Sequence, residues 1–206
     1  ICFQLAVALI AAFYCLYAGL TRVYLPFSSR TADLSFGIVP LGVLVFLATV
    51  NSVNLTDGLD GLAGSVSAVF FLFLGALLAL QGLGGGLEVL SFCLAGALAA
   101  YLVFNVDRAS VFMGDTGSLA LGGFAAAITL FSGNALLLPF LGAMFVVSSI
   151  SVILQVISYK ARRKRIFLMA PIHHHFQEKG YSESKIAYCY AAVTALMGLL
   201  LLIPYL

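Results

Sequence analysis

Long runs of apolar residues alternate with short polar segments along the whole chain. A helix needs about 20 apolar residues to cross the hydrocarbon core of a bilayer. Seven runs are long enough to approach this requirement, and each predicts a membrane-spanning helix: 1–20, 36–53, 62–81, 88–104, 118–132, 134–158 and 186–206. The fifth run is short and rich in glycine, which favours close packing against neighbouring helices. The pattern therefore predicts an all-α polytopic helical bundle whose two ends lie on opposite sides of a membrane.

Composition agrees with this interpretation and excludes a soluble globular protein. The 206 residues are 63% hydrophobic and 9% charged, whereas soluble domains carry roughly 25% charged residues. Mean hydropathy is +1.12. The four cysteines all lie inside apolar runs, where a free cysteine behaves as a small buried hydrophobe. We predict neither a disulfide framework nor a metal site from them, and we expect a single membrane domain over 1–206.

Basic residues are distributed unevenly between the two sets of alternating loops. The first set consists of 51–61, 105–117 and 159–185 and carries eight Lys or Arg: Arg108, Lys160, Arg162, Arg163, Lys164, Arg165, Lys179 and Lys185. The second set consists of 21–35, 82–87 and the break near 132–133, and it carries Arg22 and Arg30. Because Lys and Arg accumulate in cytoplasmic loops, the first set is predicted to face the cytoplasm.

Acidic residues and histidines gather on the same predicted cytoplasmic face, although they played no part in assigning it. They are Asp57, Asp60, Asp107, Asp115, His173, His174 and His175. Ionisable groups at the edge of membrane segments are costly to desolvate, and they mark functional sites by default. The distribution predicts one cytoplasmic-face site built from three loops.

The first of these loops combines two carboxylates with two carboxamides. Asp57 and Asp60 are three residues apart and would share one face if this segment were helical. An alternative is ordinary capping, in which Thr56 begins the following helix and the acids suit its dipole. Capping explains one acid well, but it explains poorly the presence of both acids together with Asn51 and Asn54.

In the second loop, Asp115 stands between two glycines just before the next predicted helix. Mg²⁺ prefers carboxylate and carbonyl oxygens and usually keeps waters and substrate phosphates around it, so one or two carboxylates plus an amide oxygen would suit it. The alternative is that Asp115 or Thr116 only caps the following helix. Phe112 is compatible with a core position or with stacking on a base.

The third loop begins with a basic run, 160–165, which we interpret mainly as an anchor for anionic lipid headgroups. His173, His174 and His175 follow, without the i, i+4 spacing of a helical zinc site. Imidazoles next to an acidic, metal-bearing site suit phosphate or ribose contacts; an interfacial cluster without function is the alternative. Together the loops predict metal-assisted phosphoryl transfer from a water-soluble substrate to a lipid acceptor.

Three segments carry a resemblance to a known family. They are Asn-Leu-Thr-Asp-Gly-Leu-Asp-Gly-Leu-Ala (54–63), Phe-Met-Gly-Asp-Thr-Gly-Ser (112–118) and Ala-Pro-Ile-His-His-His-Phe (170–176). They resemble the polyprenyl-phosphate N-acetylhexosamine-1-phosphate transferases. The resemblance implies ten spans, of which this chain would hold the last seven, about the C-terminal two-thirds of the full protein.

The resemblance also implies a reaction. Phospho-N-acetylmuramoyl-pentapeptide would pass from UDP-N-acetylmuramoyl-pentapeptide to undecaprenyl phosphate, giving lipid I and UMP for peptidoglycan synthesis, with Mg²⁺ as cofactor. The site would lie on the cytoplasmic face of the bacterial inner membrane. We expect a homodimer and no nucleic-acid partner.

By position in the matching motifs, the resemblance assigns residue roles. Asp115 would bind the metal, with Asn54 as a second ligand. The pocket for the uridine diphosphate would be lined by Asn51, Asp57, Asp60, Asn105 and Phe112, with Phe112 stacking on uracil. The sugar, phosphate or peptide portion would face His173, His174 and His175. Asp115 and His174 are the catalytic groups that we predict.

One departure and three alternatives accompany the resemblance. The family carries an adjacent Asp-Asp pair on an earlier cytoplasmic loop, and this chain has no such pair. Because the chain also opens on Ile1 within an apolar run, we expect a fragment that is inactive by itself. The alternatives are a sister transferase for N-acetylglucosamine 1-phosphate, which the His-His-His-Phe segment disfavours, a cation-coupled transporter, and a purely structural membrane subunit.

Overall fold

The structure, a computed structural model, describes residues 1–83, 85–106 and 108–206. Our expectation for Asp107 therefore lies outside the described residues. A long helix overlaps each of the seven predicted runs: α1 (Cys2–Tyr17), α2 (Ile38–Thr56), α3 (Leu62–Leu80), α4 (Gly86–Asn105), α5 (Gly114–Phe131), α7 (Ala143–Arg162) and α9 (Glu183–Leu202). Between them lie α6 (Leu138–Leu141), α8 (Ile172–Glu178), the 3₁₀ turns Ser35–Gly37 and Ile203–Tyr205, and the strands β1 (Arg22–Tyr24) and β2 (Thr31–Asp33).

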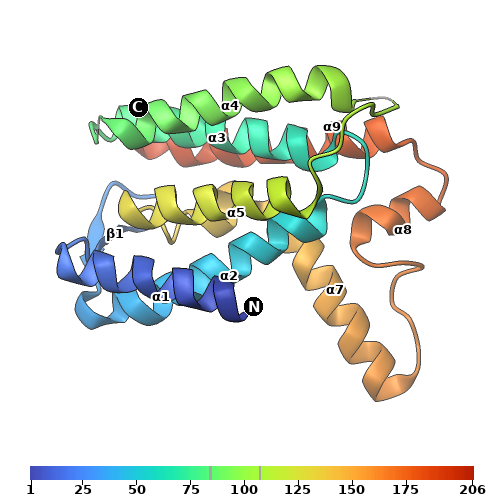
Figure 1. The fold of residues 1–206 in the computed structure, drawn as a ribbon, viewed down its shortest axis with the longest axis horizontal. Coiled ribbons are helices and arrows are strands. Elements are labelled where there is room, and N and C mark those ends of the chain that lie inside the picture. Colours follow the sequence, from blue (N-terminus) through green and yellow to red (C-terminus); the bar gives the residue numbers. More distant parts are fainter. Residues whose placement is uncertain (84, 107) are drawn as a thin grey trace.

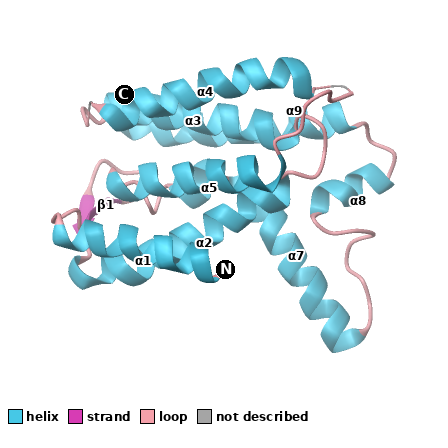
Figure 2. Ribbon diagram, in the orientation of Figure 1, coloured by secondary structure: helices cyan, strands magenta, loops and turns pink. Residues whose placement is uncertain are grey.

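The long helices run back and forth, so that alternate loops meet at the same end of the molecule (Figures 1 and 2). Five of them are long and apolar enough to cross a membrane: α2, α3, α4, α7 and α9. Helix α1 is apolar but has 16 residues. The predicted all-α polytopic membrane architecture is thus confirmed, and the chain ends lie at opposite ends of the bundle.

Helix α3 is the most buried of the candidate membrane helices and lies at the centre of its part of the bundle. It packs mainly against α4 and α9, whereas α2 packs against α1 and α5. Glycines let these helices approach closely, which is a common device in membrane bundles. A Cβ atom on Gly122 of α5 would lie 2.6 Å from the Cα atom of Val50 in α2.

Several boundaries differ from those predicted, and two of the differences move a predicted site residue. Helix α2 continues to Thr56, so Asn51 and Asn54 lie on a helix and not in a loop. Helix α5 already begins at Gly114, which places Asp115 in its first turn. The predicted run 134–158 is interrupted, and α7 starts at Ala143.

The interruption and the helix extension have physical causes. Pro139 stands in the first turn of the short α6, because proline lacks the N–H that a helix interior requires. Gly142, with φ −90° and ψ 30°, separates α6 from α7. At the other end, α7 continues to Arg162, so that Lys160 and Arg162 occupy its last turn. The helix dipole stabilises positive charges at this end of a helix.

The opposite end of the bundle carries a feature that the sequence did not predict, since 21–35 was interpreted as a plain loop. Strands β1 and β2 form an antiparallel pair with Val23 opposite Ala32. Tyr24 N–H donates to Gly133 O at 2.8 Å, and the Tyr205 hydroxyl donates to Ser28 O at 3.0 Å. The hairpin therefore ties three distant segments together on the side away from the site.

Candidate active site

A pocket of about 330 Å³ opens at the end of the bundle where the predicted cytoplasmic loops meet. This volume lies at the lower end of the range typical of ligand sites. The pocket, which we call the acidic pocket, is lined by Asp57, Gly58, Leu59, Asp60, Asn105, Phe112, Gly114 and Glu183. Residues from the three predicted cytoplasmic regions of the sequence, including the start of α9, therefore form one cavity.

Asp115 is held beside this pocket by Asn54. The Asn54 Nδ2 group donates to Asp115 Oδ1 at 2.8 Å and to Ser118 Oγ at 2.9 Å. The Ser118 hydroxyl donates its own hydrogen to Gly114 O at 3.0 Å, so Ser118 accepts from Asn54 and fixes the direction of the amide. Asn54 thus turns its NH₂ group toward Asp115, while its Oδ1 is the atom that we predict as a metal ligand.

Asp57 and Asp115 form a pair of interacting carboxylates. Burial, and secondly the charge of Asp115, raises the pKa of Asp57 above its ordinary value. A divalent cation relieves such repulsion, and Mg²⁺ is commonly held by one or two carboxylates that leave the rest of its shell to water and phosphate. Among the residues that the structure describes, no group of three or more His, Cys, Asp and Glu side chains is gathered as a metal site. Asp57 and Asp115 offer carboxylate oxygens of the kind that Mg²⁺ prefers, beside the predicted ligand Oδ1 of Asn54.

The loop 57–61 is not helical, which corrects two expectations. Thr56 does not cap α3: it ends α2, and its hydroxyl donates to Ser52 O at 2.8 Å. The residue before α3 is Gly61, at φ +72°, a left-handed conformation that glycine adopts without strain. Asp57 and Asp60 consequently both line the pocket because of the path of the loop, and not because they lie on one face of a helix.

Asp60 and Asn105 line the pocket, but they also hold its loops in place. Asp60 Oδ2 accepts from Ala109 N–H at 2.9 Å. Asn105 Oδ1 accepts from Gly61 N–H at 3.0 Å, and its Nδ2 donates to Val111 O at 2.8 Å. Asn105 is only 5% exposed, so its polar atoms are committed to joining Gly61 to Val111.

Phe112 and Asn51 have opposite placements. Phe112 is 72% exposed on the pocket lining, which excludes the core interpretation and leaves its ring face available for stacking. Asn51 does not line the acidic pocket. Its Nδ2 donates to Leu47 O at 2.8 Å and to Gln4 Oε1 of α1 at 3.2 Å, so the side chain faces α1.

Two of the three histidines join the site from behind the loop 57–61. A Cβ atom on Gly58 would lie 2.6 Å from Nε2 of His173 and 2.9 Å from Nε2 of His174. His173 is fully buried; burial, with a smaller contribution from His174, lowers its pKa to about 4, so it is neutral at neutral pH. The third, His175, instead accepts from Leu168 N–H at 3.1 Å and lies edge-on to Phe167.

Glu183 and Gln177 belong to the site but were not among the predicted site residues. Glu183 lines the pocket and accepts from the Asp60 N–H at 2.8 Å and from Gln177 Nε2 at 3.0 Å. In sequence, an acid directly after Ser182 at the start of an apolar run is typical of a helix N-terminus. The helix-start pattern explains Glu183 locally, and its contacts with Asp60 and Gln177 could not be predicted from it.

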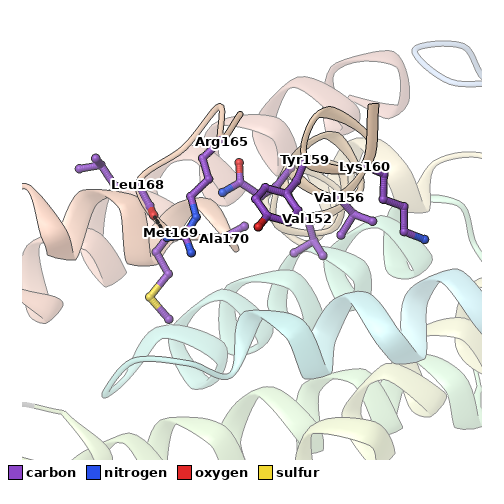
Figure 3. A pocket seen from close by; sticks show the side chains of 9 residues that line it. Val152, Val156, Tyr159, Lys160, Arg165, Leu168, Met169 and Ala170 are labelled. Atoms are coloured by element: carbon purple, nitrogen blue, oxygen red, sulfur yellow. Dashed lines mark hydrogen bonds between the residues drawn. The ribbon is translucent and has the colours of Figure 1, made fainter. Parts of the chain in front are cut away.

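A larger cavity, about 600 Å³, lies along the last turns of α7 and is distinct from the acidic pocket. Figure 3 shows the aliphatic residues of α7 and of 168–170 on its walls, together with Tyr159, Lys160 and Arg165. The Arg165 guanidinium donates to Leu168 O at 3.4 Å. The cavity therefore combines an apolar lining with two cations at the predicted cytoplasmic end of a membrane helix.

Comparison with known proteins gives a consistent result. The family model of glycosyl transferase family 4 matches residues 1–133. Relatives include proteins named phospho-N-acetylmuramoyl-pentapeptide-transferase. The one from Caldanaerobacter subterraneus subsp. tengcongensis is 45% identical over 174 residues, which is 84% of this chain and 55% of the relative.

Two further relatives bear the same name. That from Helicobacter pylori strain Shi470 is 44% identical over 199 residues, 89% of this chain and 56% of its own length. The relative from Clostridium perfringens strain SM101 is 45% identical over 179 residues, which is 86% of this chain and 54% of the relative. The chain thus spans about half the length of the curated relatives it matches.

Proposed function

The chain belongs to glycosyl transferase family 4, and from that premise we propose that the full-length protein is a sugar-1-phosphate transferase of the membrane. It passes phospho-N-acetylmuramoyl-pentapeptide from its UDP carrier to undecaprenyl phosphate and releases UMP, and lipid I is the product. The names of the relatives at 44–45% identity support this choice of substrate.

The observation that carries the proposal is the acidic pocket, in which Asp57 and the exposed ring of Phe112 share one lining while Asn54 holds Asp115 at 2.8 Å. Two acids alone would repel a diphosphate. If they held Mg²⁺ they would bind one, because the cation takes oxygens from both the protein and the phosphates. Phe112 then offers its ring to the base. A nucleoside diphosphate sugar has both a diphosphate for the metal and a base for the ring of Phe112.

When bound, Mg²⁺ supplies charge stabilisation of the diphosphate oxygens during transfer. The protein groups do the positioning. Asn54 orients Asp115, Asp60 and Asn105 fix the loops, and His173 and His174 support the loop 57–61 from behind at Gly58.

The cavity along the last turns of α7, which we call the α7 cavity, suits the lipid acceptor. A polyprenyl phosphate has a long hydrocarbon tail and an anionic head, and the cavity has aliphatic walls with Lys160 and Arg165 near its cytoplasmic end (Figure 3). Arginine binds phosphate through a planar fork of donors. The acceptor would therefore approach from the bilayer while the nucleotide arrives from the cytoplasm.

Replacing Asp115 with Asn tests the proposal. The variant keeps the shape of the side chain and the contact with Asn54 but removes the charge that would bind Mg²⁺. We expect UMP release from UDP-N-acetylmuramoyl-pentapeptide to fall by about a hundredfold or more, as is typical when a group that stabilises transition-state charge is lost. The assay uses the protein at its full length, in detergent with undecaprenyl phosphate and graded Mg²⁺.

The matched control is Asp33→Asn, the same chemical change in β2 on the opposite end of the bundle, where Asp33 accepts from Ser35 N–H at 2.8 Å. Its UMP release should equal that of the unchanged protein. Unchanged release by Asp115→Asn would exclude Asp115 as the metal ligand. Turnover of UDP-N-acetylglucosamine in place of the muramoyl substrate would favour the sister transferase.

A further inference from the structure

A chain of hydrogen bonds joins the loop 57–61 to His174, and the direction of each bond follows from the groups that make it. The backbone N–H of Asp60 lies 2.8 Å from Glu183 Oε2, and Nε2 of Gln177 lies 3.0 Å from Glu183 Oε1. A backbone N–H can only donate, and an ionised carboxylate can only accept. Both bonds therefore end on Glu183, which has an acceptor oxygen for each.

This arrangement leaves one orientation for the amide of Gln177. Its NH₂ group faces Glu183, so its Oε1 faces Nδ1 of His174 at 2.9 Å. A carbonyl oxygen accepts only, and hence the hydrogen of this last bond belongs to Nδ1. In the neutral imidazole the other nitrogen, Nε2, then holds the free lone pair.

The free nitrogen is directed at the acidic pocket's wall. A Cβ atom on Gly58 would lie 2.9 Å from His174 Nε2, which places this nitrogen against the loop that carries Asp57 and Asp60. Gly58 and Glu183 both line the pocket. The hydrogen-bond chain thus runs from Glu183, which lines the cavity, to a ring nitrogen behind the loop that forms part of its wall.

We propose that Glu183 is a positioning residue that acts through Gln177: it keeps the proton of His174 on Nδ1 and leaves Nε2 as an acceptor facing the loop 57–61. This role rests on the transferase function proposed above, in which the loop 57–61 presents its acids to the bound sugar phosphate. The other tautomer would direct an N–H at this loop in place of a lone pair.

Ordinary capping does not account for this residue. An acid at the first position of a helix is favoured by the helix dipole, and Glu183 occupies that position in α9. Both of its oxygens are nevertheless committed to groups outside α9, on 57–61 and on α8. Removing the charge should accordingly change the tautomer of His174, an effect that loss of a cap would not produce.

The substitution Glu183→Gln tests the proposal because its outcome is determined by the same logic. The Asp60 N–H still requires an acceptor, so the new carboxamide turns its oxygen toward Asp60 and its NH₂ group toward Gln177. Gln177 must then accept this bond and turn its own NH₂ group toward His174. Nδ1 becomes the acceptor, and the proton moves to Nε2.

The measurement is ¹⁵N nuclear magnetic resonance of the histidine rings in the full-length protein in detergent, because the nitrogen shift distinguishes protonated from unprotonated ring nitrogens. The His174 signals are assigned from a His174→Gln variant. We expect a protonated Nδ1 in the unchanged protein and a protonated Nε2 in Glu183→Gln. UMP release should fall about tenfold, the loss typical of one unmade hydrogen bond.

A second substitution makes the test specific. In the double variant Glu183→Gln with Gln177→Glu, the carboxylate now at 177 accepts both from the new carboxamide and from His174 Nδ1–H. The original tautomer should return, and with it most of the activity. The matched control is Glu178→Gln, which removes one negative charge from the exposed end of α8 and should leave the tautomer and UMP release unchanged.

The outcomes separate the positioning role from the proposed function. If Nδ1 of His174 stays protonated in Glu183→Gln, or if the double variant fails to restore the tautomer, the positioning role is overturned. If the unchanged full-length protein releases no UMP, the proposed function fails, and the tautomer measurement still decides whether Glu183 controls His174.

Discussion

Gly58 is the residue whose lack of a side chain does most to shape the acidic pocket. Two imidazoles press against it, because Nε2 of His173 and Nε2 of His174 lie within 3 Å of the point where a Cβ atom would stand. Its backbone conformation does not itself require glycine, since its φ lies outside the left-handed range. Glycine is required here because the two imidazole rings leave no room for a Cβ atom.

We therefore predict that Gly58→Ala is strongly harmful. Forcing a methyl group into a packed position typically costs about 1–3 kcal/mol, and here the cost falls on the loop that carries both acids. The variant should unfold at a lower temperature in detergent and should lose most UMP release. Gly96→Ala on the exposed face of α4, where nothing lies within 4 Å, should change neither; equal behaviour of the two variants would refute the packing argument.

Individual residues show how far the sequence could lead. Residue type and loop alternation were enough to gather Asp57, Asp60 and Phe112 at one pocket. They could not give side-chain direction, because this depends on partners far along the chain. Asn51 faces α1 since Gln4 offers an acceptor there, and His175 turns to the backbone of Leu168. Neither partner has a recognisable spacing in the sequence.

At the scale of helices, the contact between α2 and α5 sets the position of the predicted metal ligands. Gly122 lies where the two helices approach each other. A Cβ atom at this position would lie 2.6 Å from the Cα atom of Val50, so only glycine fits without a shift. The same pair of helices carries the bond between Asn54 and Asp115 at its site end. Backbone atoms cannot move aside as a flexible side chain can, so any larger residue must separate the helices.

Gly122→Ala should consequently disturb the site from a distance. We expect a lower unfolding temperature, corresponding to about 1–3 kcal/mol, and a higher Mg²⁺ concentration for half-maximal UMP release, because Asp115 moves relative to Asn54 and Asp57. The neighbouring Gly123→Ala faces open space and serves as the control. A Gly122→Ala variant that loses stability but keeps its Mg²⁺ dependence would show that α5 does not position Asp115.

The helices themselves were largely predictable, because apolar length alone marks them, whereas their ends were not. Apolar runs stop where polar residues begin, yet α2 and α5 extend through polar residues that find partners across the bundle, as Asn54 does with Ser118. The break at Gly142 was also missed, since the residues around it are as apolar as those within a helix. The hairpin of β1 and β2 was hidden for a different reason: three-residue strands are too short to show an alternating pattern.

At the scale of the whole molecule, the two ends of the bundle are chemically different. One end carries the acidic pocket and the basic run, and the other carries the hairpin (Figure 1). We predict that these ends face opposite sides of the membrane, with the site end in the cytoplasm, as the excess of Lys and Arg indicates.

Cysteine labelling in intact cells measures this orientation. In a background where Cys2, Cys15, Cys93 and Cys189 are replaced, Ser29→Cys on the hairpin should react with a membrane-impermeant maleimide added outside. Glu178→Cys on α8 should react only after the cells are permeabilised. Both positions are exposed, so access to the reagent is the only difference between them. The reverse pattern would invert the orientation and move the proposed reaction to the wrong side for a cytoplasmic nucleotide.

Helix α7 leans away from its bundle, as Figure 1 shows. Its buried residues, Phe145, Ser148 and Ser151, all belong to its first half, while Ile153 and Ile157 further along are 56% and 57% exposed. A leaning helix adjusts its tilt when the hydrocarbon layer thickens or thins, and 163–171 is carried at its tip. We therefore expect the acyl chain length of the surrounding lipids to change the position of Arg165 relative to the headgroups, and with it the geometry of the α7 cavity.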